Sequence, residues 1–339
     1  MKKKKLLYIG NKLGHKGYTA TAIDVLAPQL RSEGYELVAV SDKKIKAQRM
    51  LHMVQTVWKH RKDTAFVLID TYSTLNFYYA HIVAKLCRRL SLAYIPILHG
   101  GNLPQRLKRS PQKSKKLFGM AYRNVAPSKY LYNAFAAQGF EYLTHIPNTL
   151  AIERYPFLPR NEIRPSLLWV RSFAKLYNPM LAIDVLVTLR NKGYNATLTM
   201  VGPAKDESFA QCQAKAKTSN LPVTFTGILP KEEWIALAAK HDIFINTTNV
   251  DNTPVSVMEG MALGLPVVST NVGGLPFLIE NEISGVLVDP NDPDAFVAAI
   301  EWLITHPDRA HNLALAARKK VERFDWEEVK ELWNSLLRQ

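Results

Sequence analysis

The stretch IFINTTNVDNTPVSVMEGMALGLPVVST, residues 243–270, contains a strand, a loop, a helix and a second strand in close succession. IFINTT predicts a buried strand that ends in polar side chains, and PVVST predicts the next strand. Between them we expect a helix at 254–263, with Thr253 as its N-cap, Pro254 in its first turn and Gly264 at its end. Strand–helix–strand units of this kind build parallel sheets, so the stretch indicates an α/β protein.

The same alternation extends over the whole chain. Before a proline- and arginine-rich stretch at 154–166, the apolar segments are KLLYIG, ELVAV, TAFVLID, LAYIPIL, NVAP and LTHIP. After it they are LLWV, ATLTMVG, VTFTG, IFINT, PVVST and GVLV. The pattern predicts two doubly wound domains with parallel sheets, joined near 155–165, and two terminal helices at 308–323 and 325–338. Ligands of such sheets bind where strands end, so we expect a site in the cleft between the domains.

Length and composition agree with a globular protein of two domains. The chain has 339 residues, of which 47% are apolar and 22% charged. Its two cysteines, Cys87 and Cys212, have no metal-ligand spacing and are expected to be reduced. The apolar run after the first lysines is too short for a signal peptide, and we find no candidate membrane span. We therefore expect a cytoplasmic protein, or one attached only to the surface of a membrane.

Positive charge is confined to the first half of the chain. Residues 1–165 contain 28 Lys and Arg against 9 Asp and Glu, a net charge of +19, whereas residues 166–339 have a net charge of −4. This asymmetry indicates that one domain faces nucleic acid, anionic lipid headgroups or a phosphorylated substrate. The densest cluster lies at 104–118. Its plainer interpretation is a solvated loop and helix face.

Three loops after strands contain residues suited to binding an anion. Gly14 and Gly17 precede a helix, where they either admit a phosphate or form a tight turn. His99 ends a buried strand and meets either a ligand or a local polar partner. Arg171 and Lys175 lie four residues apart, after the first strand of the second half. These two cations either bind a diphosphate or are exposed surface residues without a ligand.

A further loop, the final one, has the sequence NTTNVDNTPVSVMEGMALGLP and contains two carboxylates, Asp251 and Glu259. On the expected helix, Glu259 lies among apolar Val255, Met258 and Leu263, where an unpaired carboxylate is costly. It therefore bonds either to a protein group, such as the backbone or a buried arginine, or to a ligand. The free amides after Asp251 form a cradle for an anion or a hydroxyl.

The run 251–290, with MEGMALGLPVVSTNVGGLPFLIENEISGVLVDPND, resembles the signature of retaining nucleotide-sugar glycosyltransferases of family 4, among the group 1 glycosyltransferases. Their signature has an acid, seven residues, a second acid, ALGxPVV, a diglycine and a GxLV strand. The resemblance implies the GT-B fold, in which two Rossmann-like domains face each other across a cleft. Here these would be an acceptor-binding domain at 1–160 and a nucleotide-sugar-binding domain at 161–322. The helix at 323–339 would cross back onto the first domain.

The resemblance also implies roles for the residues of the donor. Glu259 would bond the ribose hydroxyls, and Asp251 would contact hydroxyls of the transferred sugar. Arg171 and Lys175 would neutralise the leaving diphosphate. The backbone beside Asp251 would complete the donor site with Asn252, Thr253, Pro254 and Val255.

In the first domain, His99 would face the donor sugar and the acceptor, and Gly14 and Gly17 would lie near the diphosphate. Transfer of this type would need no metal and no cofactor besides the nucleotide-diphosphate sugar as co-substrate. Three features depart from the family: the first acid is Asp251 instead of Glu, the two cations lie four apart instead of five, and Phe277 replaces a Glu.

We therefore expect a retaining hexosyltransferase that adds a sugar to a glycan acceptor, lipid-linked, in the synthesis of a surface polysaccharide or lipopolysaccharide. The basic first half would bind an anionic membrane surface, at the cytoplasmic face of the inner membrane. Nucleic acid is not expected, because the charges are not interleaved with aromatic residues. The alternatives are a GT-B epimerase, a sugar phosphorylase, and a polyanion- or membrane-binding protein without catalytic activity.

Overall fold

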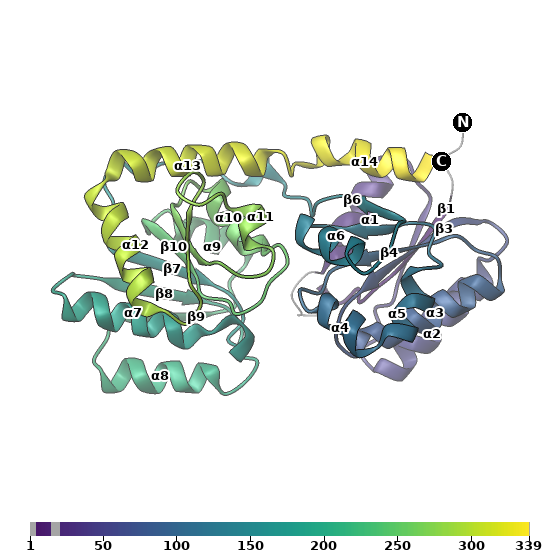
Figure 1. The fold of residues 1–339 in the computed structure, drawn as a ribbon, viewed down its shortest axis with the longest axis horizontal. Helices are drawn as coiled ribbons and strands as arrows, with labels where there is room; N and C mark the ends of the chain where they lie inside the picture. The colour runs from purple at the N-terminus through teal and green to yellow at the C-terminus, as the bar shows by residue number, and fades with distance from the viewer. Residues whose placement is uncertain (1–4, 15–20, 339) are drawn as a thin grey trace. The chain divides into compact units, whose positions relative to one another are not determined.

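The structure is a computed structural model that describes residues 5–14 and 21–338. The chain forms two compact units, each with one six-stranded parallel sheet covered by helices (Figure 1). Unit 1 comprises Met1–Thr149 and Trp326–Gln339, and unit 2 comprises Leu150–Asp325. The predicted α/β class with two doubly wound parallel sheets is confirmed. Each predicted strand has its counterpart in one of the two sheets.

The sheet of unit 1 has the strand order β2-β1-β3-β4-β5-β6. The order reverses between β1 and β3, because the chain adds β2 on one side of β1 and all later strands on the other. The strands are β1 (Lys5–Ile9), β2 (Leu37–Val40), β3 (Thr64–Thr71), β4 (Tyr94–Leu98), β5 (Asn124–Ala126) and β6 (Leu143–His145). The helices are α1 (Ala22–Ser32), α2 (Lys46–Lys59), α3 (Asn76–Arg89), α4 (Leu103–Arg109), α5 (Pro111–Phe118), α6 (Lys129–Ala136) and α14 (Trp326–Arg338).

Helices cover both faces of this sheet, because successive residues of a strand point to opposite sides. Leu7 and Ile9 of β1 pack in the cluster that contains side chains of α2, α3, α5 and α6. Leu6 and Tyr8 pack in the opposite cluster, with side chains of α1 and of the terminal helix α14, including Trp333. The last helix thus belongs to unit 1, although it follows unit 2 in the chain.

The sheet of unit 2 has the order β12-β11-β10-β7-β8-β9, which reverses between β7 and β10. The strands are β7 (Ser166–Val170), β8 (Thr197–Val201), β9 (Val223–Gly227), β10 (Ile243–Asn246), β11 (Val267–Thr270) and β12 (Val286–Val288). The helices are α7 (Pro179–Asn191), α8 (Ser208–Thr218), α9 (Lys231–Ala238), α10 (Val255–Ala262), α11 (Leu275–Leu278), α12 (Pro293–Thr305) and α13 (Pro307–Glu322). Two short 3₁₀ helices, η2 (Ile152–Arg154) and η3 (Lys175–Tyr177), complete the unit.

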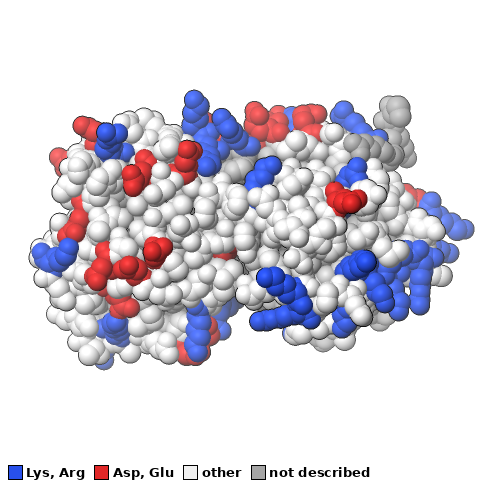
Figure 2. Space-filling model, in the orientation of Figure 1, with Lys and Arg blue, Asp and Glu red and all other residues white. Residues whose placement is uncertain are grey.

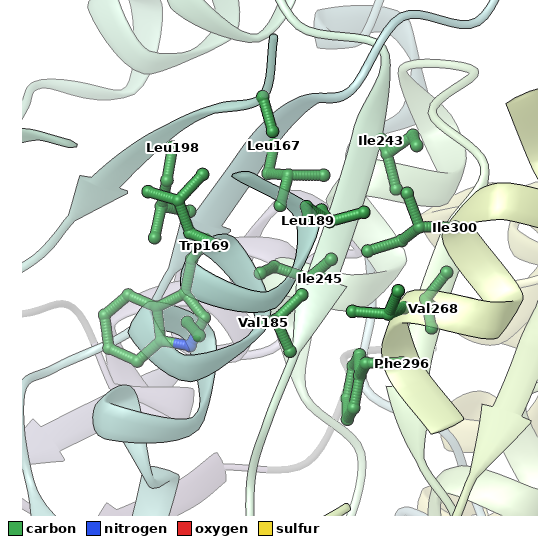
Figure 3. Close-up of a cluster of buried hydrophobic side chains, with 14 of the residues drawn as sticks. Leu167, Trp169, Val185, Leu189, Leu198, Ile243, Ile245, Val268, Phe296 and Ile300 are labelled. Atoms are coloured by element: carbon green, nitrogen blue, oxygen red, sulfur yellow. The ribbon is translucent and has the colours of Figure 1, made fainter. Parts of the chain in front are cut away.

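One face of this sheet packs against α7 and α12 (Figure 3). Leu167 and Trp169 of β7 meet Val185 of α7 and Phe296 of α12 in one buried cluster. The intervening Leu168 points to the other face, where it packs with side chains of α10 and α13. Burial on both faces explains why the strands are apolar throughout.

The helix predicted at 254–263 is α10, but its start differs from the prediction. Pro254 is the N-cap, with an extended backbone, so Thr253 is not the cap. Proline suits this position because it leaves no amide unpaired. Gly264 ends the helix as predicted: its φ is +79°, and a Cβ there would lie 2.9 Å from a ring carbon of Phe157.

The chain enters unit 2 at residue 150, whereas the sequence placed the boundary at 160. Arg160 explains the difference, because its guanidinium donates to the carbonyls of Ala238, His241 and Leu263. These bonds fasten the arginine-rich stretch to unit 2. The chain returns to unit 1 at Trp326, close to the expected position of 323.

Cys87 and Cys212 are free and buried, and burial raises the pKa of each thiol to about 12. Among the described residues, no helix is both long enough and apolar enough to span a bilayer.

Candidate functional site

Arg171 and Asp251 form an ion pair at the point where the strand order of unit 2 reverses. Arg171 directly follows β7, and Asp251 lies in the loop after the adjacent strand β10. Nη2 of Arg171 contacts Oδ2 of Asp251. Ligands of open α/β sheets bind at this kind of reversal. The fold therefore joins two of the predicted site residues that lie 80 positions apart in the sequence.

The side chain of Arg171 is 17% exposed, and its guanidinium is not fully satisfied. It lies 4.5 Å from the ring centroid of Tyr177, and within the described chain its Nε has no hydrogen-bond partner. Burial lowers the pKa of Arg171, while the charges of Tyr177 and Glu259 raise it. The backbone of Arg171 packs closely against Gly202, because a Cβ at Gly202 would lie 1.8 Å from the carbonyl oxygen of Arg171. Only glycine fits there.

The loop that carries Asp251 rests on the diglycine of the signature. The amide of Gly274 donates to the carbonyl of Asp251 over 3.0 Å. A Cβ at Gly274 would lie 1.6 Å from the carbonyl oxygen of Asn252, and one at Gly273 would lie 2.2 Å from that of Asp251. Asp251 Oδ1 in turn accepts from the Asn252 amide over 2.8 Å. The diglycine thus lets two loops approach closely enough to fix the first acid.

Glu259 lies on α10 and is 4% exposed, and it is paired inside unit 2. Its Oε1 accepts a hydrogen bond of 2.8 Å from the hydroxyl of Tyr155 and forms an ion pair with Nζ of Lys231. The ammonium of Lys231 also lies 5.3 Å from the ring centroid of Trp234. These contacts account for a carboxylate in an apolar helix, because they offset its desolvation.

Sequence reasoning missed both partners of Glu259. Tyr155 lies in the stretch that is predicted to join the two domains. Lys231 is the first residue of α9, four positions after the end of β9, so this cation lies at the same edge of the sheet as Arg171. That position after a strand was the signal that could have found it.

Lys175 is not part of the group around Arg171. Its side chain is 71% exposed, and its Nζ lies 2.5 Å from Oε1 of Glu207. The hydrogen bond that Lys175 donates to Glu207 raises the pKa of Lys175. The Lys175 amide donates to Asp206 Oδ2 over 2.8 Å, which holds the backbone of η3. The predicted pair of cations is therefore separated in the structure.

The remaining predicted donor residues lie at the start of α10. Asn252 and Pro254 are buried, Thr253 is partly buried, and Val255 is 41% exposed. Next to them, the buried hydroxyl of Ser256 has no hydrogen-bond partner within the described residues. This polar group was also missed by the sequence analysis.

Unit 1 has its own buried polar cluster at the reversal of its sheet. His99, directly after β4, lies with Nε2 2.7 Å from Oδ1 of Asp70 near the end of β3. The hydroxyl of Tyr8, in β1, donates to the same oxygen over 2.9 Å. Asp70 is fully buried, and a Cβ at Gly10 would lie 2.4 Å from its Oδ2. Asp70 holds His99 in place, yet sequence reasoning passed over it as part of an apolar strand.

Two further predictions concern the surroundings of this cluster. The amide of Gly14 donates to Oδ2 of Asp24 over 3.3 Å, while Gly17 lies outside the described residues. The ring of Tyr72 lies 5.4 Å from that of His99, and burial raises the pKa of Tyr72. Among the described residues, no group of three or more His, Cys, Asp and Glu side chains could hold a metal ion.

Residues 155–320 match the family model of the group 1 glycosyl transferases. These residues belong to the group 1 glycosyl transferase family. The match contains Arg171, Asp251, Glu259 and both missed partners of Glu259. The family was named correctly from the sequence, although the match does not separate family 4 from other members.

Curated relatives of the chain are also glycosyltransferases. The chain is 29% identical to the glycogen synthase of Mycobacterium tuberculosis over 197 residues, which are 56% of this chain and 47% of that protein. It is 27% identical to the amylovoran biosynthesis glycosyltransferase AmsK of Erwinia amylovora over 265 residues, 73% of this chain and 65% of AmsK. The chain thus spans about half to two thirds of the length of these relatives.

The whole fold resembles solved structures. The Anabaena protein HepE, in complex with UDP and glucose, matches with a TM-score of 0.80 over 99% of both chains at 17% identity. Sucrose-phosphate synthase of Thermosynechococcus elongatus matches with a TM-score of 0.80 over 99% of both chains at 16% identity. These likenesses confirm the GT-B fold.

Proposed function

We propose that this protein is a metal-independent, retaining glycosyltransferase of the hexosyltransferase type. It transfers a sugar from a nucleotide-diphosphate sugar to a lipid-linked glycan acceptor, in the synthesis of a surface polysaccharide or lipopolysaccharide. The observation that carries the proposal is the Arg171–Asp251 ion pair, which lies at the sheet reversal within the part of the chain that matches the family.

Arg171 is suited to bind the diphosphate of the donor. Its guanidinium already contacts Asp251, and its buried Nε has no partner within the described residues. Leaving a buried donor unpaired costs about 1–3 kcal/mol, a cost that a phosphate oxygen would remove. A fixed cation beside the departing diphosphate lowers the barrier electrostatically, without proton transfer to the leaving group.

Glu259 is suited to bind the ribose. Tyr155 and Lys231 both contact Oε1, so they set the orientation of the carboxylate and leave Oε2 for a ligand hydroxyl. Asp251, held by the diglycine loop, would contact hydroxyls of the transferred sugar. Backbone amides in the segment from Asn252 to Val255 would complete the donor site.

Unit 1 would bind the acceptor, with His99 as the residue that meets the sugars. Asp70 fixes the ring of His99 through Nε2, which holds the other ring nitrogen in one orientation. The name of the relative AmsK supports an acceptor in polysaccharide synthesis. The basic cluster at 104–118 supports contact with anionic lipids, at the cytoplasmic face of the inner membrane.

The donor is tested by calorimetry with UDP-, GDP-, ADP- and CMP-sugars, followed by transfer assays with the sugar that binds. Retention is read from the anomeric configuration of the product by NMR. E259Q should weaken donor binding by about 100-fold or more, because the amide replaces one acceptor of the ribose with a donor. The exposed neighbour Glu232 offers a matched control, and E232Q should leave donor binding unchanged.

Y155F tests the orientation of Glu259 separately. Removing one hydrogen bond from the carboxylate should weaken donor affinity by about tenfold, with the fold intact. Unchanged donor affinity in both E259Q and Y155F would refute the assigned ribose site. Binding of lipid or nucleic acid without any nucleotide-sugar binding would instead support the alternative without catalysis.

A further inference from the structure

Unit 1 has an outer surface with few acidic side chains, formed by the layer of α2, α3 and α5. Residues 43–140 contain 18 Lys and Arg but only two acids, Asp63 and Asp70. Asp63 pairs with Nζ of Lys5 at 2.6 Å, and Asp70 is fully buried. In Figure 2 the Lys and Arg side chains gather over the region where Figure 1 places these helices, at lower right.

The same helices expose large apolar side chains. Leu51 and Trp58 of α2 are 57% and 54% exposed, and Tyr78 and Ile82 of α3 are 38% and 43% exposed. Residues four or seven apart share one side of a helix, so each pair forms a stripe. Since α2 packs against α3 and α3 against α5, the stripes belong to one continuous layer. We call this surface the α2–α3–α5 face.

Two cations of this face lie against aromatic rings. The guanidinium of Arg61 lies 4.4 Å from the ring centroid of Trp58, and Nζ of Lys113 lies 5.0 Å from that of Tyr78. Arg88 of α3 donates to the carbonyl of Lys116 in α5 over 2.6 Å, which ties the two helices together. The face thus combines positive charge with amphipathic aromatic groups.

We propose that the α2–α3–α5 face docks on an anionic lipid bilayer, with Leu51, Trp58, Tyr78 and Ile82 entering the boundary between headgroups and acyl chains. The inference deepens the proposed function and rests on it only for the lipid-linked acceptor. Aromatic and aliphatic groups beside lysine and arginine are the combination that binds membrane interfaces. Nucleic acid would account for the charge but not for the exposed Leu51 and Ile82.

The surface extends from the functional edge of the sheet. The first residues of α3 follow β3, whose end carries Asp70, and Leu75 just before the helix is 68% exposed. A bilayer on this face would therefore lie beside the cluster that holds His99. This position suits an acceptor whose lipid stays in the membrane while its sugar enters the site.

The test is co-sedimentation of the full chain with vesicles of phosphatidylglycerol and phosphatidylcholine, without donor. L51Q/W58Q should weaken binding by about tenfold or more, since it keeps all charges and removes only the apolar insertion. The matched control is I283Q/L315Q, which changes two comparably exposed apolar residues of unit 2, at 51% and 44% exposure, and should bind as the wild type does.

Trp58 supplies a second readout that does not depend on a double variant. Vesicles should shift the tryptophan emission to the blue, and W58F should lose most of that shift, because Trp58 enters a less polar medium. Vesicles of phosphatidylcholine alone should bind at least about tenfold more weakly, because the lysines and arginines then meet no anionic headgroup.

Three results would overturn the inference: unchanged vesicle binding by L51Q/W58Q, no spectral shift from Trp58, or displacement of the vesicles by single-stranded RNA. Donor binding is measured in parallel by calorimetry without lipid. If the protein binds vesicles but no nucleotide sugar, the proposed function alone is contradicted. If it binds a nucleotide sugar but no vesicles, this inference alone is contradicted.

Discussion

Asp70 and His99 form a buried pair at the carboxyl edge of the sheet of unit 1, with Oδ1 and Nε2 2.7 Å apart. Asp70 lies near the end of β3 and His99 directly follows the neighbouring strand β4, so the strand order itself brings them together. A buried carboxylate that accepts from one ring nitrogen fixes both the tautomer and the orientation of a histidine. This pair leads to the first prediction.

D70N should lower kcat by about 10- to 1,000-fold with little change in donor affinity, because an amide can hold His99 in the wrong tautomer. Steady-state kinetics with the identified donor and acceptor give the measurement. D63N, which changes an exposed acid of the same unit, should leave kcat unchanged. A wild-type kcat in D70N would show that His99 needs no orienting partner.

R171A and K175A should differ, although the sequence treated the two cations as a pair. R171A should lower kcat/KM by about 100-fold or more, because a fixed cation beside the diphosphate is lost. K175A should cost about tenfold less than R171A, since Lys175 is exposed and bound to Glu207. R171K controls for folding, because it keeps the charge and loses only the planar fork. Equal losses in R171A and K175A would contradict the separation seen here.

G274A should destabilise the protein by about 1–3 kcal/mol and also weaken donor binding, because a Cβ would collide with the carbonyl of Asn252 and displace the Asp251 loop. Denaturant unfolding and calorimetry measure the two effects. G193A is the control: its φ of +90° makes alanine costly by about 1–2 kcal/mol, but no atom lies within 4 Å of the added Cβ. G193A should leave donor affinity intact, and a matching loss of affinity in G193A would refute the specific role of the diglycine.

His241 should make the stability of unit 2 depend on pH. Burial lowers the pKa of His241 from 6.5 to about 4, and Nδ1 lies 2.9 Å from Oγ of Ser166. The pKa of His241 is lower in the folded state than in the unfolded state. Its contribution to the free energy of unfolding is therefore complete above about pH 6.5 and is lost as the pH falls towards 4.

The free energy of unfolding, measured in denaturant, should fall by about 2 kcal/mol between pH 7 and pH 5 because of His241. H241Q cannot titrate and should lack this part of the pH dependence, whereas H306Q, at an exposed histidine, should retain it. Identical pH profiles for the wild type and H241Q would contradict the assignment.

Much of the fold could be predicted because its signals are local. Strands such as TAFVLID and LAYIPIL are largely continuous apolar runs. The terminal helices end near the residues where the helical spacing of apolar side chains stops. The predicted helices at 308–323 and 325–338 correspond to α13 and α14. The start of α10 was misplaced by one residue, because either Thr253 or Pro254 could form the cap.

The candidate site could be predicted only in part. Arg171, Asp251 and Glu259 stood out through their positions after strands and through the resemblance to a family. Their partners did not, because Tyr155 and Lys231 lie in segments that carry no motif. Asp70 was hidden in a strand, where one acid after four apolar residues has no evident role until His99 is placed beside it.

The sequence by itself determined two α/β units, their strands and the family, because apolar periodicity and short motifs act over a few neighbouring residues. Only the tertiary structure decided which charged groups meet. Arg171 pairs with Asp251 because β7 and β10 are neighbours, and Lys175 turns away to Glu207. Strand order sets these distances, and it depends on packing over the whole sheet.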